Sequence, residues 1–257
     1  MCDPLSTVTF VTAFIDLSQD NVYFDNNPLR EKTTEKRIEY FRTFAKTGLP
    51  IALFVCSKSI HIANQLTDEY KNVKLISVID LKNTWTYNII SNTNELPLHR
   101  DPKKDSFDFL TLMNAKIEFT NYVTYINPFN TTHFAWIDFN VCHILKNTES
   151  TLHKLITYTH NKLQFPMLLI PGCWEKQSSD RDFINKIIWR FCGGLFIGDI
   201  GSIQDFFNRT LIEFPKFINE YKTLTWEVNY WSWLESKTDW SPQWFYAGHD
   251  DTMLSLP

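Results

Sequence analysis

The chain has 257 residues, of which 44% are hydrophobic and 16% aromatic, and its formal net charge is -4. This composition excludes an intrinsically disordered protein, which combines low hydrophobicity with high net charge. The slightly acidic balance also argues against a general nucleic-acid binder, because such proteins usually present a basic face, so we expect no nucleic-acid partner.

The cysteines and the N-terminus indicate the compartment. Five cysteines are present, and no pair has the C-x-x-C spacing of a metal site. An odd number of cysteines without such spacing predicts reduced thiols in a cytoplasmic protein. Residues 1–17 lack a basic segment before their apolar run, and no stretch of the chain reaches the roughly 18 uncharged apolar residues of a membrane helix. We therefore expect neither a signal peptide nor a membrane span.

The first half of the chain alternates strands with helices. Residues 7–16, TVTFVTAFID, form an apolar, β-branched run that is typical of a buried strand. After the polar segment 17–32, Thr33 or Thr34 is expected to cap a helix that reaches about Lys46. Further strands are predicted over 51–57, 73–80 and 133–137, helices over 59–70 and 107–124, and a loop over 82–105. This alternation predicts an α/β fold with a mostly parallel sheet flanked by helices.

The second half of the chain has longer helices and more aromatic residues. We expect strands over 165–171 and 189–199, helices over 202–221 and 225–235, and a C-terminal strand or loop that carries His249. No internal repeat or linker divides the sequence, so a single domain over residues 1–257 is expected.

Acidic residues end several of the predicted strands. Asp16, Asp80 and Asp138 occupy such positions, and ligands of parallel sheets bind outside the carboxyl ends of the strands. Asp138, Phe139 and Asn140 form a degenerate D-x-D motif, in which two oxygen ligands on alternate residues can face one hard cation. The alternative interpretation is a strand end at which Asn140 begins a turn or caps a helix over 141–147.

Five segments occur in an order that carries a resemblance to a known family. They are TFVTAFID, LMNAKIEF, FAWIDFN, FCGGLFIGD and YAGHDDTML, spread over about 8–256. In these segments the chain resembles the HtrL/YibB-like proteins, which look like glycosyltransferases of the GT-A fold, a type of domain found in large DNA viruses and bacteria. The resemblance implies a Rossmann-type sheet in which about 7–150 bind a nucleotide sugar. Residues 151–257 would then form a smaller acceptor-side subregion and a C-terminal metal loop.

The resemblance also implies donor-binding residues. The first strand and the loop after it would hold the nucleotide, with Thr12, Ala13, Phe14 and Asp16 as the contacts and Phe14 stacking on the base. The alternative is that the first three are strand core, whereas an acid that ends an apolar strand needs partners or water. Lys116 would reach the donor sugar or its diphosphate; alternatively, it lies on a solvated helix face.

The remaining site residues follow from the later segments. His249 would complete a metal site with Asp138 and Asn140, although a neutral amide binds a hard cation less strongly than a carboxylate does. Gly193 and Gly194 would line the donor-sugar or acceptor pocket, or else ease strand packing. Glu227 would be the base that deprotonates the acceptor if the reaction inverts the anomeric configuration; the alternative is an ordinary helix acid beside core aromatic residues.

These expectations describe a metal-assisted glycosyltransferase. It would move a sugar from a UDP-sugar donor to a hydroxyl of a glycan acceptor, with Mn²⁺ or Mg²⁺ neutralising the leaving diphosphate. Two alternatives remain at this point: a non-catalytic glycan-binding protein, and a metal-dependent phosphoesterase or nucleotidyltransferase that uses the same acids.

Overall fold

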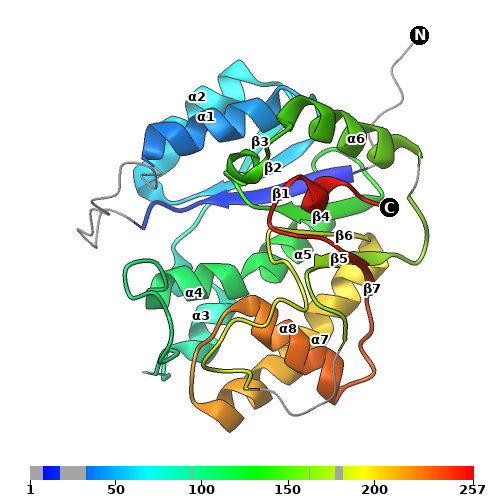
Figure 1. Ribbon diagram of the computed structural model, residues 1–257. Helices are drawn as coiled ribbons and strands as arrows, with labels where there is room; N and C mark the ends of the chain where they lie inside the picture. Colours follow the sequence, from blue (N-terminus) through cyan, green and yellow to red (C-terminus); the bar gives the residue numbers. More distant parts are fainter. Residues whose placement is uncertain (1–7, 18–32, 94, 162, 177–181) are drawn as a thin grey trace.

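One mixed sheet organises the molecule (Figure 1). The structure is a computed structural model that describes residues 8–17, 33–93, 95–161, 163–176 and 182–257. In this part of the chain seven strands form a sheet in the order β3-β2-β1-β4-β6-β5-β7. Their bounds are β1 (Val8–Phe14), β2 (Ile51–Val55), β3 (Val73–Val78), β4 (His133–Ile137), β5 (Leu168–Gly172), β6 (Leu195–Asp199) and β7 (Gln243–Tyr246). Among these seven strands, β6 alone runs antiparallel to its neighbours, which are β4 and β5; the other pairs are parallel. This confirms the predicted mostly parallel sheet.

Helices cover both faces of the sheet (Figure 1). One face carries α1 (Thr34–Ala45), α2 (Ile60–Glu69) and α6 (Thr148–Asn161). The other carries α3 (Trp85–Ile90), α4 (Phe107–Asn114), α5 (Lys116–Ile126), α7 (Ile200–Tyr221) and α8 (Glu227–Lys237). Short 3₁₀ turns are η1 (Ser57–Ser59), η2 (Leu81–Asn83), η3 (Val141–Ile144) and η4 (Asp251–Leu254). Within the described ranges, none of the helices combines the length and the apolarity that crossing a membrane requires.

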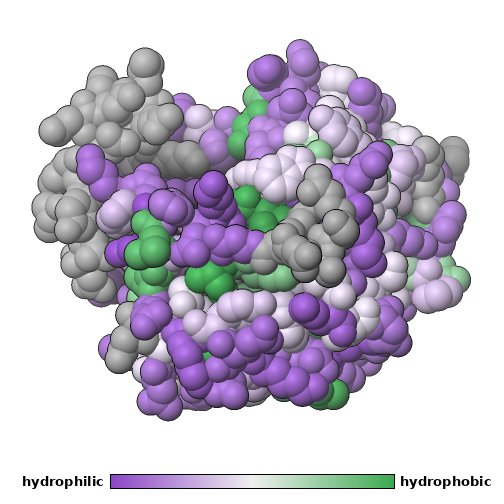
Figure 2. Space-filling view, turned by 60° about the horizontal axis from the view of Figure 1, so that its bottom comes forward, coloured by the Kyte–Doolittle hydropathy of each residue, from purple (hydrophilic) through white to green (hydrophobic). Residues whose placement is uncertain are grey.

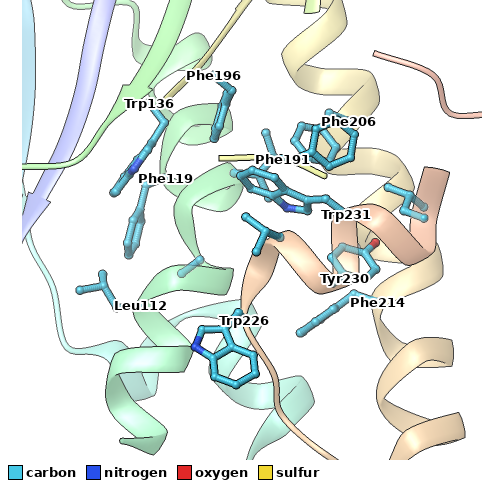
Figure 3. Close-up of a cluster of buried hydrophobic side chains, with 14 of the residues drawn as sticks. Leu112, Phe119, Trp136, Phe191, Phe196, Phe206, Phe214, Trp226, Tyr230 and Trp231 are labelled. Atoms are coloured by element: carbon cyan, nitrogen blue, oxygen red, sulfur yellow. The ribbon is translucent and has the colours of Figure 1, made fainter. Parts of the chain in front are cut away.

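The strand β1 contributes to two hydrophobic clusters because successive side chains point to opposite faces of a sheet. Phe10 and Phe14 belong to the cluster under α1, whereas Val11 and Ala13 belong to the cluster on the opposite face. The second cluster contains most of the tryptophans, and Figure 3 labels Trp136, Trp226 and Trp231 among its members. Its residues hold α5, α7 and α8 against the sheet.

Aromatic contacts fix the position of α8 in that cluster (Figure 3). Trp231 meets Phe196 of β6 and Phe206 of α7 edge to face, with ring centroids 5.8 and 5.7 Å apart. Such pairs contribute about 0.5–1.5 kcal/mol each beyond the area they bury. The helix that begins with Glu227 is therefore held firmly against the sheet.

Polar caps define where several helices begin. The hydroxyl of Thr33 accepts the backbone N–H of Lys36 (3.2 Å), which confirms the helix expected from Thr33 or Thr34. Asp199 caps α7 by accepting the N–H of Ser202 (3.1 Å), and it also accepts the N–H of Met167 (2.6 Å). Burial raises the pKa of Asp199, but these hydrogen bonds outweigh burial and keep the pKa below its usual range.

The loop expected over 82–105 contains helix α3, so this prediction was wrong in part. The start of α3 is capped by Thr84 and by a distant carboxylate: Glu118 of α5 accepts the N–H groups of Trp85 (2.8 Å) and Thr86 (3.0 Å). A cap that comes from another helix leaves no signal in the local sequence.

Three other boundaries differ from the prediction. The helix expected over 107–124 is two helices, α4 and α5, joined at Ala115. The helix over 141–147, one of the two alternatives for Asn140, is only the 3₁₀ turn η3; Asn140 therefore begins a turn, and its side chain makes no capping hydrogen bond. The strand expected over 189–199 narrows to β6, because residues 189–194 form turns that bring Gly193 close to α8.

Candidate functional site

The carboxyl ends of β1 and β4 meet where the strand order reverses. The chain runs outward from β1 through β2 to β3, and β4 then pairs with the other side of β1. Open α/β sheets bind ligands at such a switch point. Asp16 follows the end of β1 and Asp138 follows the end of β4, whereas Asp80 lies beyond β3 at the sheet edge and caps η2 through the N–H of Lys82 (3.0 Å). The switch point therefore selects Asp16 and Asp138 from the three strand-end acids.

A buried ion cluster lies beside Asp138. The Lys116 ammonium donates to the Gly193 carbonyl (2.8 Å) and to Glu227 Oε1 (2.8 Å), and it lies 3.1 Å from Asp138 Oδ1. The Trp136 indole N–H also donates to Asp138 Oδ1 (2.9 Å). Lys116 is only 1% exposed, so it does not lie on a solvated helix face. The cluster of Lys116, Asp138 and Glu227 carries one positive and two negative charges, which gives a net charge of about -1 at neutral pH.

The two carboxylates keep Lys116 charged. Burial lowers the pKa of Lys116, but Asp138 and Glu227 outweigh burial and raise it above its ordinary value. Asp138 is the more accessible acid of the pair, with a side chain 37% exposed, whereas that of Glu227 is 7% exposed. The contacts of Asp138 with Lys116 and Trp136 are made through Oδ1, and among the described residues no hydrogen bond is made to Oδ2.

Gly193 and Gly194 let the turn before β6 approach the acids closely. A Cβ on Gly193 would lie 2.0 Å from Glu227 Oε1, and one on Gly194 would lie 2.9 Å from the methyl carbon of Met253. The Gly194 carbonyl also accepts the N–H of Asp138 (3.1 Å). Gly193 thus serves the cluster through its backbone, because any side chain there would displace the Glu227 carboxylate.

His249 lies on the loop after β7, beside two cysteines. The imidazole packs edge to face on Trp189, with ring centroids 4.1 Å apart. Its ligand nitrogen and the sulfurs of Cys173 and Cys192 all lie within 4.8 Å of one another. No two cysteines have metal-site spacing in the sequence, but the fold brings together two that are 19 residues apart, Cys173 and Cys192, with their sulfurs 3.5 Å apart.

The imidazole of His249 is neutral at pH 7. Burial is the largest cause that lowers its pKa, and Lys104 acts in the same direction. Asp138, Glu227 and Asp250 oppose this shift without cancelling it. A neutral ring keeps a nitrogen lone pair for a metal ion.

The residues of β1 are strand core. Thr12, Ala13 and Phe14 are 0%, 6% and 0% exposed. The ring of Phe14 packs on Phe139 (centroids 4.6 Å apart), and the Arg37 guanidinium lies 4.7 Å from its centroid. Phe14 therefore has no exposed ring face on which a base could stack, whereas contacts to the nucleotide from Thr12 and Ala13 stay predictions.

Asp16 follows the carboxyl end of β1 and Asn140 follows that of β4, as predicted. Asp16 is 9% exposed and accepts the hydroxyl of Thr34 (3.1 Å). Burial lowers the pKa of Arg37, and the nearby charge of Asp16 opposes this shift. Asn140 begins η3, and its backbone carbonyl accepts the N–H of His143 (3.0 Å). The ligand roles of Asp16 and Asn140 stay predictions.

The surface is hollowed on the face shown in Figure 2, where hydrophobic residues gather inside a more hydrophilic rim. A cavity of about 670 Å³ is lined by residues that include Leu96, Phe183 and Tyr221, with Glu95 and Asp182 as its acids. None of the residues predicted to bind donor, metal or acceptor is among its lining residues. The candidate site therefore depends on the cluster around Asp138 and not on this cavity.

Comparisons with known proteins give a family and two similar structures. A family profile described as a bacterial protein of unknown function (HtrL_YibB) matches residues 33–223. No curated protein sequence matches the chain. Among solved structures, the chain is similar to 4-diphosphocytidyl-2C-methyl-D-erythritolsynthase from Anaerococcus prevotii, with a TM-score of 0.45, 10% identity and coverage of 94% of this chain and 87% of that one. It is also similar to mouse xyloside xylosyltransferase 1 in its apo form, with a TM-score of 0.47, 8% identity and coverage of 93% and 84%.

Proposed function

The chain belongs to the HtrL/YibB family, and we propose that it transfers a sugar from a nucleoside diphosphate donor, a UDP-sugar, to a hydroxyl of a glycan acceptor. The observation that carries this proposal is the partly exposed carboxylate of Asp138 at the switch point of the sheet, backed by the buried charges of Lys116 and Glu227. The GT-A resemblance of the sequence supports the same activity.

The donor would occupy the carboxyl ends of β1 and β4. Asp16 with the backbone near Thr12 and Ala13 would contact the nucleoside, and Asp138, Asn140 and His249 are the proposed ligands of Mn²⁺ or Mg²⁺. The fit of a divalent cation is supported by the net negative charge of the cluster and by the neutral imidazole of His249. Such a cation would neutralise the diphosphate as it leaves.

Lys116 has an indirect role in this proposal. Its ammonium is 1% exposed and already contacts Gly193, Asp138 and Glu227, so it has no surface with which to touch the diphosphate. Lys116 is therefore a positioning residue that holds the Asp138 carboxylate in place. This role replaces the direct contact with the donor that the sequence resemblance implies.

Glu227 is the proposed base if the reaction inverts the anomeric carbon. The variant Glu227→Gln keeps the shape of the side chain and an oxygen that accepts from Lys116, so we expect the protein to fold and to bind UDP normally. Sugar transfer should fall by roughly 100-fold or more, which is the scale of general-base catalysis. The measurements are kcat/KM for transfer and the Kd of UDP by calorimetry.

Glu235→Gln provides the control for this variant. Glu235 is the other buried acid of α8 and pairs with Arg190 at 2.8 Å. Its replacement by glutamine should leave sugar transfer unchanged as long as the variant folds. Full activity of Glu227→Gln, together with a product that retains the donor's anomeric configuration by proton NMR, would show that no base acts at this position.

UDP with Mn²⁺ should stabilise the fold. A ligand at 100 times its Kd adds roughly 2.7 kcal/mol to the free energy of unfolding by mass action. The measurement is the melting temperature with UDP, with Mn²⁺ and with both, and UMP serves as the control that lacks the diphosphate. An unchanged melting temperature at saturating UDP and Mn²⁺ contradicts the donor site.

The product of turnover separates the proposal from its rivals. Sugar transfer releases UDP, a nucleotidyltransferase releases pyrophosphate and a phosphoesterase releases phosphate. A protein that binds glycans without metal and turns over no donor would be a glycan-binding protein instead.

A further inference from the structure

Three potential metal ligands come together from separate segments at one end of the sheet. Cys173 directly follows β5, Cys192 lies in the turn before β6, and His249 lies in the loop after β7. In the part of the chain that the structure describes, this is the single group of three or more histidine, cysteine or acidic side chains whose ligand atoms lie within 4.8 Å of one another. The proposed function uses neither thiol.

The separations are close to those of a tetrahedral zinc site. Zinc binds sulfur at about 2.3 Å and nitrogen at about 2.0 Å, so two sulfurs around one ion lie about 3.8 Å apart and a sulfur and a nitrogen about 3.5 Å apart. The sulfurs of Cys173 and Cys192 are 3.5 Å apart, and the His249 nitrogen is within 4.8 Å of both. An ion bound by all three ligands would hold the imidazole nitrogen about 3.5 Å from each sulfur.

Backbone hydrogen bonds hold two of the three segments before any ion binds. The N–H of Cys192 donates to the Pro171 carbonyl (2.7 Å), and the N–H of Cys173 donates to the Trp189 carbonyl (2.9 Å). These bonds tie the turn that carries Cys192 to the end of β5.

The loop that carries His249 is held in the same way. The N–H of Ala247 donates to the Gly172 carbonyl (2.8 Å), and the N–H of Gly248 donates to the hydroxyl of Thr252 (2.8 Å). That hydroxyl in turn donates to Asp250 Oδ1 (2.6 Å). The ligands are therefore presented by ordered backbone.

We propose that Cys173, Cys192 and His249 bind a zinc ion at a site distinct from that of the diphosphate cation. Two thiolates and an imidazole are soft ligands that select zinc over Mg²⁺ or Mn²⁺, which prefer oxygen. The two thiols lose their protons to solvent on binding, and a water molecule completes the tetrahedral coordination.

The ion stabilises the ion cluster through the polypeptide chain. Cys192 immediately precedes Gly193, whose carbonyl accepts the Lys116 ammonium (2.8 Å). Fixing Cys192 to β5 and to the C-terminal loop therefore fixes the carbonyl that Lys116 needs. A zinc ion that takes His249 leaves the cation on the diphosphate with Asp138 and Asn140, in place of the three ligands proposed above.

Cobalt substitution tests the site. The reduced, metal-free protein is titrated with Co²⁺, a visible stand-in for Zn²⁺, and then with Zn²⁺ against a chromophoric chelator. We expect one equivalent of Co²⁺ to produce a thiolate-to-cobalt charge-transfer band and the intense d–d bands of tetrahedral geometry. Loss of one outer-shell partner costs about 10–100-fold in affinity, so Cys173→Ser, Cys192→Ser and His249→Ala should each weaken zinc binding by at least about 100-fold.

Matched controls separate the proposed zinc site from other thiols and from the donor site. Cys56→Ser and Cys142→Ser, a half-buried and a buried cysteine elsewhere in the fold, should keep the cobalt spectrum. Asp138→Ala should keep it as well, even if it abolishes binding of UDP with Mn²⁺. Circular dichroism checks that each variant is folded. If a serine variant does not fold, Cys173→Ala is used in its place to test the thiolate ligands, because Cys173 is only half-buried.

Four outcomes overturn the proposal. One is a cobalt spectrum without thiolate charge transfer, and a second is a spectrum that persists in both Cys173→Ser and Cys192→Ser. The third is a dependence on Asp138 and His249 but not on the thiols, which would assign His249 to the diphosphate cation. A disulfide between Cys173 and Cys192, formed by a thiol oxidant and detected by mass, supports a redox pair instead if the reduced protein fails to bind cobalt.

Discussion

Replacing Lys116 by methionine is expected to lower the free energy of unfolding by about 3–5 kcal/mol, which is the usual cost of removing one partner from a buried ion pair. The reason is the local charge balance. Without the ammonium, Glu227 keeps a carboxylate in a site that is 5% exposed, and Asp138 loses the cation 3.1 Å from its Oδ1. The measurement is urea unfolding at neutral pH, with the midpoint and the slope reported together.

Two comparisons isolate the electrostatic part of this effect. Lys216→Met removes an exposed lysine that pairs with Glu213 one helical turn away at 2.8 Å, and exposed pairs contribute only about 0–1 kcal/mol. The double variant Lys116→Met with Glu227→Gln should regain much of the lost stability, because it removes one of the two uncompensated charges. If Lys116→Met costs no more than Lys216→Met, the cluster does not stabilise the fold in the way described.

The second large effect is expected for Asp138→Ala, as a loss of sugar transfer with the fold retained. The side chain of Asp138 is 37% exposed, and Lys116 keeps Glu227 as its partner at 2.8 Å after the change. Loss of an outer-shell partner of a metal costs about 10–100-fold, so loss of a proposed ligand should lower kcat/KM by at least about 100-fold. The measurement is UDP release from a UDP-sugar, alongside the circular dichroism spectrum.

Asp80→Ala is the matched control for that variant. Asp80 also follows a strand, but it caps η2 at the edge of the sheet and lies outside the ion cluster. Transfer should therefore proceed normally in Asp80→Ala. Normal transfer by Asp138→Ala would remove the D-x-N motif from the site altogether.

Much of the fold could be predicted from local sequence because the decisive signals are local. The run TVTFVTAFID predicts β1, and Thr33 predicts the start of α1, since both follow from patterns within a few residues. The position of Asp138 at a strand end was also predictable. The cap on α3 was not, because the Glu118 carboxylate that provides it lies more than 30 residues away.

The candidate site was predictable only as a set of residues and not as an arrangement. Lys116, Asp138, Gly193 and Glu227 were all singled out, and the structure brings them together. The prediction placed Lys116 against the donor, whereas the structure places it against the other three residues. The burial of Lys116 depends on how α5 packs against α8 and the turn before β6. The pairing of Cys173 with Cys192 depends in the same way on β5 and β6 being neighbours in the sheet.

Because β6 runs antiparallel to β4 and β5, the segments before and after it reach opposite edges of the sheet, where the two ends of the strands lie. Leu195 at the start of β6 pairs with Ile137 at the end of β4, so the segment that precedes β6 reaches the edge that carries Asp138. Asp199 at the end of β6 pairs with His133 and begins α7 at the opposite edge. Insertions or deletions in the turn over 189–194 therefore alter the backbone beside Glu227 and Asp138, whereas those at the junction of β6 and α7 lie at the opposite edge.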